Sequence, residues 1–266
     1  MFRGLFLTEK PVEVLEMPAI LMVISIAVVV IILVILTDFR FLLYPFRPGL
    51  NPLTTAKKYD LSGNTLFISD LHLRAPTPFP FTKELRTCVE RENIKNLVIV
   101  GDLFHSPSDA EKILQTDDNL EFLGLQDISL KTYWIIGSPR HDPRDPTTNL
   151  NVVGDCAIFT HNGISVVAYH GDDLSMKGGI AHGINRFISP LIVEKMWRRL
   201  AGVDKNSWVI FGHTHIPGLD MKSRIANCGA WAAYRLVRAT RTGIVLNADP
   251  QQLHLAKIVD SSELST

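Results

Sequence analysis

Short apolar runs alternate with longer amphipathic segments through most of the chain after residue 64. Five of these runs have the length of buried strands, at 65–69, 96–100, 132–136, 164–169 and 207–211. Segments with helical spacing of apolar residues lie at 81–92 and 110–125. The later part of the chain is richer in strand-like runs, at 224–228, 233–239, 243–247 and 252–258. This order predicts an α/β first half joined to a β-rich second half, with two packed sheets flanked by helices.

Two local signals refine this pattern. Asn162-Gly163 lies between two apolar runs and predicts the turn of a β-hairpin. Ser189-Pro190 predicts the start of a helix that ends at Gly202, with the serine as N-cap and the proline at the first helical position. Apolar residues keep helical spacing through 184–200, which favours core packing, with a lid over an acyl-chain substrate as the alternative.

One apolar run, at 17–37, is far longer than the others and contains no charged residue. As a helix it would extend ~31 Å at ~1.5 Å per residue, which matches the hydrocarbon thickness of a bilayer. The run is too long for a signal peptide, and no small-residue cleavage site follows it. A buried core helix would show a polar face, which this run does not. We therefore expect a single transmembrane anchor.

The residues that flank this run predict its orientation. Four basic residues follow it, Arg40, Arg47, Lys57 and Lys58, against Arg3 and Lys10 before it. This excess predicts a single-pass protein of the cell membrane with its C-terminal side in the cytoplasm. Aromatic residues at 39–46 suit a membrane interface, and the prolines that follow suit a stiff linker. The expected organisation is a flank at 1–16, the anchor at 17–37, a juxtamembrane linker at 38–62, a catalytic domain at 63–260 and a tail at 261–266.

Charge and cysteine content narrow the classes of partner and compartment. The formal net charge is +0, so the sequence shows no polybasic footprint and we expect no nucleic-acid partner. Cys88, Cys156 and Cys228 are widely spaced and odd in number. This pattern favours buried thiols in a reducing compartment.

The ends of the predicted strands carry the candidate chemistry. Each strand is followed by Gly, Asp or His: Asp70-Leu71-His72, Gly101-Asp102, Gly137, His170-Gly171-Asp172 and Gly212-His213-Thr214-His215. An acid and an imidazole two residues apart can meet one ion at a strand end, because the chain there leaves the period-two alternation. Any one of these histidines alone would more often be a core or surface residue, as we expect for His105, His161, His182 and His254.

Taken together, these side chains form a ligand set for divalent metal ions. The set is Asp70, His72, Asp102, His170, His213 and His215. Carboxylate and imidazole without thiolate suit Mn²⁺, Fe²⁺ or Zn²⁺. Six ligands exceed the need of one tetrahedral zinc, whereas two ions ~3.5–4 Å apart that share one acid have the geometry used for in-line displacement at phosphorus.

In this order, the motifs resemble those of the calcineurin-like metallophosphoesterases, over about residues 65–258. The resemblance implies an α/β fold, a four-layer αββα sandwich, here preceded by the transmembrane helix. It implies two divalent ions, for which we expect Mn²⁺, with Fe²⁺ and Zn²⁺ as alternatives. By matching position, Asp70, His72 and His215 would hold one ion. His170 and His213 would hold the other, and Asp102 would bridge the two.

The third motif departs from the family pattern. The family has Gly-Asn-His followed by an acid, whereas this chain has Gly137-Ser138-Pro139-Arg140-His141-Asp142. Neither Ser138 nor Arg140 is an equivalent amide ligand, so the second metal would be weaker or would recruit another group. His141 is our candidate for leaving-group protonation, with Asp142 orienting it. Arg140 is our candidate for binding a phosphate oxygen of the substrate.

Two details are similar to the UDP-2,3-diacylglucosamine diphosphatases, namely His170-Gly171-Asp172 and Gly229-Ala230-Trp231. This resemblance implies a membrane-anchored phosphohydrolase that cleaves a phosphoester or pyrophosphate bond in a phosphorylated small molecule, such as a lipid-linked or nucleotide diphosphate. The alternatives are a phosphodiesterase, phosphatase or nuclease of other specificity, and a non-catalytic scaffold that lost the second metal.

Overall fold

The computed structural model describes residues 17–116, 120–175, 179–233, 238–248 and 252–258, with side chains in the N-terminal helix described at 21–29, 32–33 and 38. The chain divides into two compact units, Met1–Thr37 and Asp38–Thr266. The expected flank at 1–16 and tail at 261–266 lie outside the described residues.

The apolar run near the N-terminus forms helix α1 (Met17–Asp38). Its described apolar side chains are exposed, with Leu21 at 58%, Met22 at 59% and Ile32 at 49%. In the part of the chain that the structure describes, however, no helix has the length and apolarity needed to cross a membrane. The structure therefore does not support the expected transmembrane anchor.

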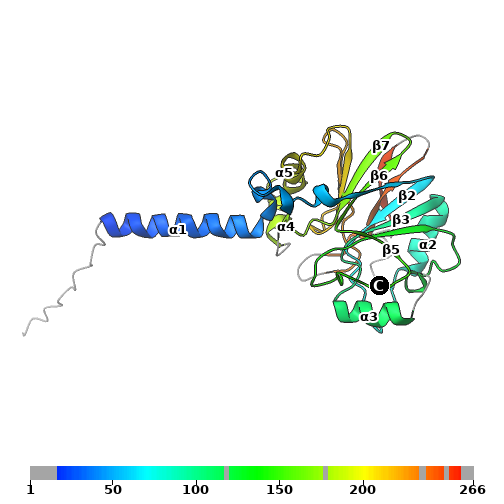
Figure 1. Ribbon diagram of the computed structural model, residues 1–266. Coiled ribbons are helices and arrows are strands. Elements are labelled where there is room, and N and C mark those ends of the chain that lie inside the picture. Colours follow the sequence, from blue (N-terminus) through cyan, green and yellow to red (C-terminus); the bar gives the residue numbers. More distant parts are fainter. Residues whose placement is uncertain (1–16, 117–119, 176–178, 234–237, 249–251, 259–266) are drawn as a thin grey trace, which may run out of the picture. The chain divides into compact units, whose positions relative to one another are not determined.

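The second unit contains two six-stranded sheets (Figure 1). The first has the order β12-β11-β2-β3-β4-β5. Its strands are β2 (Asn64–Ile68), β3 (Ile94–Val100), β4 (Lys131–Ile135), β5 (Asn151–Gly154), β11 (Thr242–Leu246) and β12 (Leu253–Lys257). Strands β2 to β5 run parallel to one another, and β11 and β12 are antiparallel additions at the β2 edge.

The second sheet has the order β1-β6-β7-β8-β10-β9. Its strands are β1 (Lys57–Asp60), β6 (Cys156–His161), β7 (Ile164–Tyr169), β8 (Trp208–Phe211), β9 (Gly218–Asp220) and β10 (Ile225–Asn227). Strands β6 and β7 form the predicted hairpin, and both turn residues, Asn162 and Gly163, have positive φ as that turn requires. Strand β8 lies parallel to both β7 and β10.

Alternating side chains of the strands build three apolar layers. On β2, Phe67 points between the two sheets, whereas Leu66 and Ile68 face helices α2 (Thr82–Arg91) and α3 (Pro107–Thr116). The outer face of the second sheet packs against α4 (Gly179–Phe187) and α5 (Ile192–Ala201). The unit is thus a mixed α/β two-sheet sandwich in the order helix, sheet, sheet, helix (Figure 1).

Residues 38–62, which we expected to be a linker, pack into this unit. They form three short 3₁₀ helices, η1 (Arg40–Leu43), η2 (Pro48–Leu50) and η3 (Pro52–Thr55), followed by β1. Phe41 and Tyr44 are buried against α5, and the Tyr44 hydroxyl accepts a hydrogen bond from Trp197 Nε1. Phe39, Phe41 and Tyr44 therefore belong to a protein core, whereas Phe46 is exposed. Strand β1 escaped prediction because it is a polar edge strand.

Four other expectations differ from the structure. The helix expected at 110–125 is the shorter α3, followed by the 3₁₀ helix η4 (Glu121–Leu123). Helix α5 begins after Leu191 rather than after Ser189, although Gly202 ends it as predicted. Phe187 and Ile188 are 82% and 70% exposed, so this part of the stripe at 184–200 is not core. Of the strand expected at 233–239, residues 234–237 lie outside the described residues and the rest is not strand.

Candidate functional site

The predicted metal ligands follow the carboxyl ends of parallel strands in both sheets. Asp70 and His72 follow β2, and Asp102 follows β3. His170 follows β7, while His213 and His215 follow β8. Neighbouring parallel strands end at the same edge of a sheet, which brings these side chains together.

Hydrogen bonds join the strand ends of the two sheets at this edge. The backbone N–H of His213 donates to Asp70 Oδ2 at 3.0 Å. His170 Nδ1 lies 2.8 Å from the carbonyl oxygen of Val100, to which it donates. His170 therefore presents Nε2 to the site, because its other ring nitrogen is committed to the backbone.

The backbone of the predicted ligands is strained. Positive φ angles occur at five of them, namely Asp70 at 55°, His72 at 47°, Asp102 at 50°, His213 at 63° and His215 at 58°. Non-glycine residues rarely adopt this conformation, which costs of order 1–3 kcal/mol each. Such strain concentrates at functional sites, where the surrounding structure imposes it.

Gly137 permits a close approach that no other residue would allow. A Cβ placed there would lie 2.4 Å from the backbone nitrogen of Asp102 and 2.4 Å from its Oδ1. The glycine therefore lets the end of β4 contact a predicted metal ligand directly. The N–H of Ser138 also donates to Asp102 Oδ1, at 2.8 Å.

Possible ligand atoms converge in four overlapping groups, within each of which all the atoms lie within 4.8 Å of one another. The groups are Asp70, His72 and His215; Asp70, Asp102 and His170; His170, Asp172 and His213; and His72, His105 and His141. All six predicted ligands belong to at least one group. Asp70 belongs to two, so it rivals Asp102 as a bridging carboxylate.

The carboxylates of Asp102 and Asp70 each lie close to two histidines. Asp102 Oδ1 lies 3.3 Å from His170 Nε2, and its Oδ2 lies 3.8 Å from His141 Nε2. Asp70 Oδ1 lies 3.0 Å from His215 Nε2 and 3.9 Å from His170 Nε2. Asp102 thus directs its two oxygens toward two different histidines, His170 and His141.

The electrostatics of the cluster favour bound cations. Burial alone would raise the pKa of Asp70, but His215 and His170 outweigh it and lower that pKa to about 2. Burial would likewise lower the pKa of His170, yet Asp102 and Asp70 raise it well above its usual value. Asp70 and Asp102, whose pKa values are both lowered, therefore stay ionised and draw positive charge to the site, whereas burial raises the pKa of Asp172 to about 7.

Two other histidines are kept neutral, as metal ligands must be. Burial lowers the pKa of His72 to about 4. Burial, followed by the charge of His170, lowers the pKa of His213 to about 4. His213 Nε2 lies 2.7 Å from the carbonyl oxygen of Ser175, which leaves Nδ1 to face a ligand.

The residues present fit a divalent metal centre. Asp172 Oδ1 is buried and has no hydrogen-bond partner among the described residues. Buried polar atoms normally have such partners, so this oxygen is suited to bind a cation. The donor set of imidazole and carboxylate suits Mn²⁺, Fe²⁺ or Zn²⁺.

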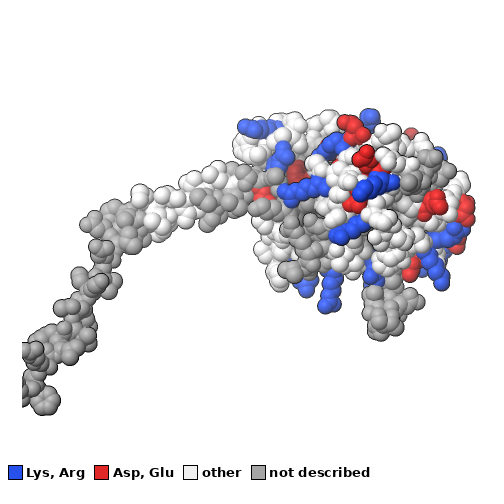
Figure 2. Space-filling view, turned by 90° about the horizontal axis from the view of Figure 1, so that it is seen from below, with Lys and Arg blue, Asp and Glu red and all other residues white. Residues whose placement is uncertain are grey.

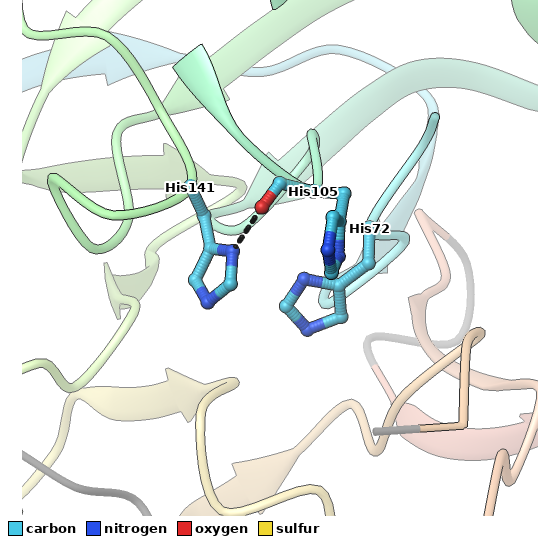
Figure 3. A group of neighbouring side chains, drawn as sticks. All are labelled: His72, His105 and His141. Atoms are coloured by element: carbon cyan, nitrogen blue, oxygen red, sulfur yellow. Dashed lines mark hydrogen bonds between the residues drawn. The ribbon is translucent and has the colours of Figure 1, made fainter. Parts of the chain in front are cut away.

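His141 lies beside this cluster, as the third motif suggested. Its Nδ1 donates to the carbonyl oxygen of His105, at 2.7 Å, as the dashed line in Figure 3 marks. The His72 ring centroid lies 4.6 Å from that of His141. His141 Nε2 therefore faces the cluster, where it could act on a leaving group or bind a metal.

Asp142 has a different role from the one we expected. Its carboxylate accepts hydrogen bonds from the N–H groups of Gly137 and Phe104, at 2.8 and 3.2 Å. Asp142 thus ties the end of β4 to the loop after β3, while the His105 carbonyl orients His141. Arg140 is exposed, and its expected contact with substrate stays a prediction.

Two residues of the site were missed from the sequence. Asp172 joins the His170 and His213 group, and its Oδ1 lies 3.6 Å from His170 Nε2. His105 contributes its carbonyl to His141 and its ring to the group with His72. The adjacent motifs Gly101-Asp102 and His170-Gly171 could have flagged both, but the spacing alone did not show that they face the site.

Comparisons with known proteins find similarity at the level of shape. No protein-family model and no curated protein matches the sequence. Vps29 complexed with Zn²⁺ from Entamoeba histolytica shares 15% identity at a TM-score of 0.45, covering 74% of this chain and 94% of that one. Yfce, a phosphoesterase from E. coli, shares 14% identity at a TM-score of 0.40, covering 74% and 100%.

A predicted phosphoesterase from Streptococcus pneumoniae shares 11% identity at a TM-score of 0.41, covering 74% of this chain and 90% of that one. These identities and TM-scores are too low to transfer any property to this chain. The function of this chain is therefore inferred from the geometry of its own site.

Proposed function

We propose that this chain is a metal-dependent phosphohydrolase of the calcineurin-like metallophosphoesterase type. One observation carries the proposal, namely the convergence of buried carboxylates and imidazoles at one edge of the two sheets. These residues would hold two divalent ions, for which we propose Mn²⁺. The bond hydrolysed would be a phosphoester or pyrophosphate bond.

The chain's own residues would supply binding, orientation and proton transfer. When bound, two divalent ions supply Lewis-acid polarisation of the phosphoryl group and an activated water. Asp102 would hold both halves of the centre in register through its two oxygens. His141, fixed by the His105 carbonyl, would deliver a proton from Nε2 to the leaving oxygen.

Asp172 is our proposed substitute for the missing amide of the third motif. Ser138 occupies the position after Gly137, and its hydroxyl accepts a 3.3 Å hydrogen bond from the N–H of Arg140. Asp172 offers a buried carboxylate oxygen within the group formed by His170 and His213. A carboxylate in place of an amide would retain an oxygen ligand and add a negative charge.

The substrate class rests on the resemblance to the UDP-2,3-diacylglucosamine diphosphatases. We propose a phosphorylated small molecule, with lipid-linked and nucleotide diphosphates as the first candidates. Lys and Arg are interspersed with Asp and Glu over the face shown in Figure 2, in line with the net charge of +0. We therefore propose no nucleic-acid partner.

Metal-dependent hydrolysis is the first test of this function. The purified full chain, loaded with Mn²⁺, should bind two equivalents of metal and hydrolyse a phosphodiester or diphosphate from a panel of nucleotide and lipid substrates. Chelation should abolish the activity and lower the melting temperature, because the ionised carboxylates would lose their counter-charge. Metal analysis, a substrate screen and thermal unfolding measure these effects.

The same experiment separates a second candidate function. The absence of an amide at Ser138 favours a non-catalytic scaffold in which one metal site has been lost. A scaffold would bind one equivalent or none and would hydrolyse nothing on the panel. Two bound equivalents without activity on any substrate would contradict the proposed hydrolase.

Membrane attachment through α1 remains our proposal. Its support is the uncharged sequence of 17–37 and the exposed apolar side chains of α1. Contiguous exposed apolar surface is unusual on a soluble protein and marks an interaction site. We further propose, from the four-to-two excess of flanking basic residues, that the C-terminal unit lies in the cytoplasm.

Cysteine labelling measures both attachment and orientation. The full chain should sediment with membranes and resist alkaline extraction. A cysteine engineered near Thr266 should react with an impermeant reagent only after the cells are opened. Cys88, Cys156 and Cys228 are buried and so provide a low background. Labelling in intact cells would reverse the orientation, and recovery in the soluble fraction would exclude attachment.

A further inference from the structure

A cleft opens beside the ligand cluster, on the side of His72 and His105. Its volume is about 330 Å³, which is within the range of small-molecule sites. Its walls include Arg74, Phe79, Phe81, Trp231 and Arg241. His72 and His105 belong both to the cluster and to the cleft, so a molecule bound at the cluster can extend into the cleft.

The far wall of this cleft is attached to a predicted metal ligand. The N–H groups of Trp231 and Ala232 donate to the carbonyl oxygen of Asp70, at 3.1 and 3.3 Å. The N–H of Arg241 donates in turn to the carbonyl oxygen of Ala230, at 2.9 Å. Arg241 is therefore held at a fixed place relative to the cluster.

Arg241 is arranged as a receptor for an anion. Its guanidinium carbon lies 4.2 Å from the ring centroid of Phe81, so the two groups form a cation–π pair. Its backbone is left-handed, with φ 52°, which a non-glycine residue adopts only under constraint. The stacked ring holds the planar guanidinium in place at the wall of the cleft.

No carboxylate in the described part of the chain forms an ion pair with Arg241 or with Arg74, the second arginine of the cleft. Arg241 Nε is buried and has no hydrogen-bond partner among the same residues. Arg74 contacts His105 Nδ1 at 3.4 Å, which leaves its charge uncompensated as well. A partly buried cation in an apolar cleft calls for an anionic ligand, and guanidinium matches phosphate oxygens.

We propose that Arg241 binds a second phosphoryl group of the substrate and so makes the enzyme selective for organic diphosphates. The phosphoryl group that is hydrolysed would lie at the cluster, and its neighbour would lie at Arg241, with Arg74 adding positive charge. The attached organic group would pack against Phe79 and Phe81. This inference rests on the proposed phosphohydrolase function.

A matched pair of substrates tests the selectivity. The p-nitrophenyl esters of thymidine 5′-monophosphate and thymidine 5′-diphosphate differ by one phosphoryl group. With the Mn²⁺-loaded full chain, R241Q should raise the KM for the diphosphate about 10–100-fold relative to the KM for the monophosphate, the range for hydrogen bonds to a charged group. F81L replaces the stacked ring with an aliphatic side chain and should raise the same ratio about 2–5-fold.

Controls separate a failure of the proposed subsite from a failure of the proposed phosphohydrolase function. R199Q removes an exposed arginine of α5 and should leave both KM values as in the wild type. If R241Q raises both KM values equally, or neither, the subsite is refuted. If the wild type hydrolyses neither ester, the proposed function fails, and titration calorimetry of the uncleaved esters then decides the subsite. Weaker binding of the diphosphate alone by R241Q supports it, and equal binding overturns it.

Discussion

Asp102→Ala should abolish hydrolysis and remove at least one of the two bound metals. Asp102 directs one oxygen toward His170 and the other toward His141, so its loss separates the two halves of the centre. Metal centres supply several kcal/mol of transition-state stabilisation, so the rate should fall roughly 10³-fold or more. Steady-state kinetics and elemental analysis of the purified protein measure the two effects.

Two further variants distinguish loss of metal binding from misfolding. Asp102→Asn keeps an acceptor for the N–H of Ser138 and should fold as the wild type does while binding metal less tightly. Asp145→Ala removes an exposed carboxylate and should change neither metal content nor rate. If Asp102→Ala retains both metals and Asp70→Ala loses both, Asp70 is the bridging ligand and our assignment is wrong.

His141→Ala should lower kcat by about 10²–10⁴-fold, the usual range for general acid–base catalysis, with metal content nearly intact. His141 is then free for proton transfer, because Asp172 offers the group of His170 and His213 an oxygen ligand in place of the amide that the third motif lacks. Asp172→Ala should then lose one metal equivalent.

Arg140→Ala should mainly raise KM if the arginine contributes equally to substrate and transition-state binding.

The rival assignment makes His141 itself the substitute ligand. Its Nε2 is 3.8 Å from Asp102 Oδ2, close enough for a shared ion. If His141→Ala loses one equivalent and excess Mn²⁺ restores its rate, His141 is a ligand and Asp172 is not needed. His254→Ala, on strand β12 away from the cluster, is the control for losing an imidazole.

Most strands were predictable because their pattern depends on burial alone. A strand buried on both faces has a continuous apolar run, such as residues 66–68 of β2 and 97–100 of β3, and its end is marked by the first glycine or acid. Edge strands β1, β5 and β9 and the start of α5 were not predicted in this way. Lys57 and Lys58 read as linker residues, and the pairing of β1 with β6, about a hundred residues away, cannot be read from local sequence.

The candidate ligands could likewise be found in the sequence, because acids and imidazoles after apolar strands stand out from their surroundings. The arrangement of the third motif could not. Asp142 sits next to His141 in the chain but bonds to the backbone of Gly137 and Phe104, while the orienting carbonyl comes from His105, 36 positions earlier. Contacts of this kind depend on which strand ends meet, which no local pattern encodes.

By itself, then, the sequence determined where most of the strands lie along the chain, the ligand types and their position at strand ends, since these follow from burial and from the chemistry of Asp and His. Only the tertiary structure decided that residues 38–62 belong to the folded unit, that Asp172 faces His170, and that Arg241 stacks on Phe81 beside the cluster. The physical reason is that these contacts join segments far apart in the chain, or side chains whose direction is set by strained backbone. Hydrophobic periodicity records whether a residue is buried, but not which partner it meets.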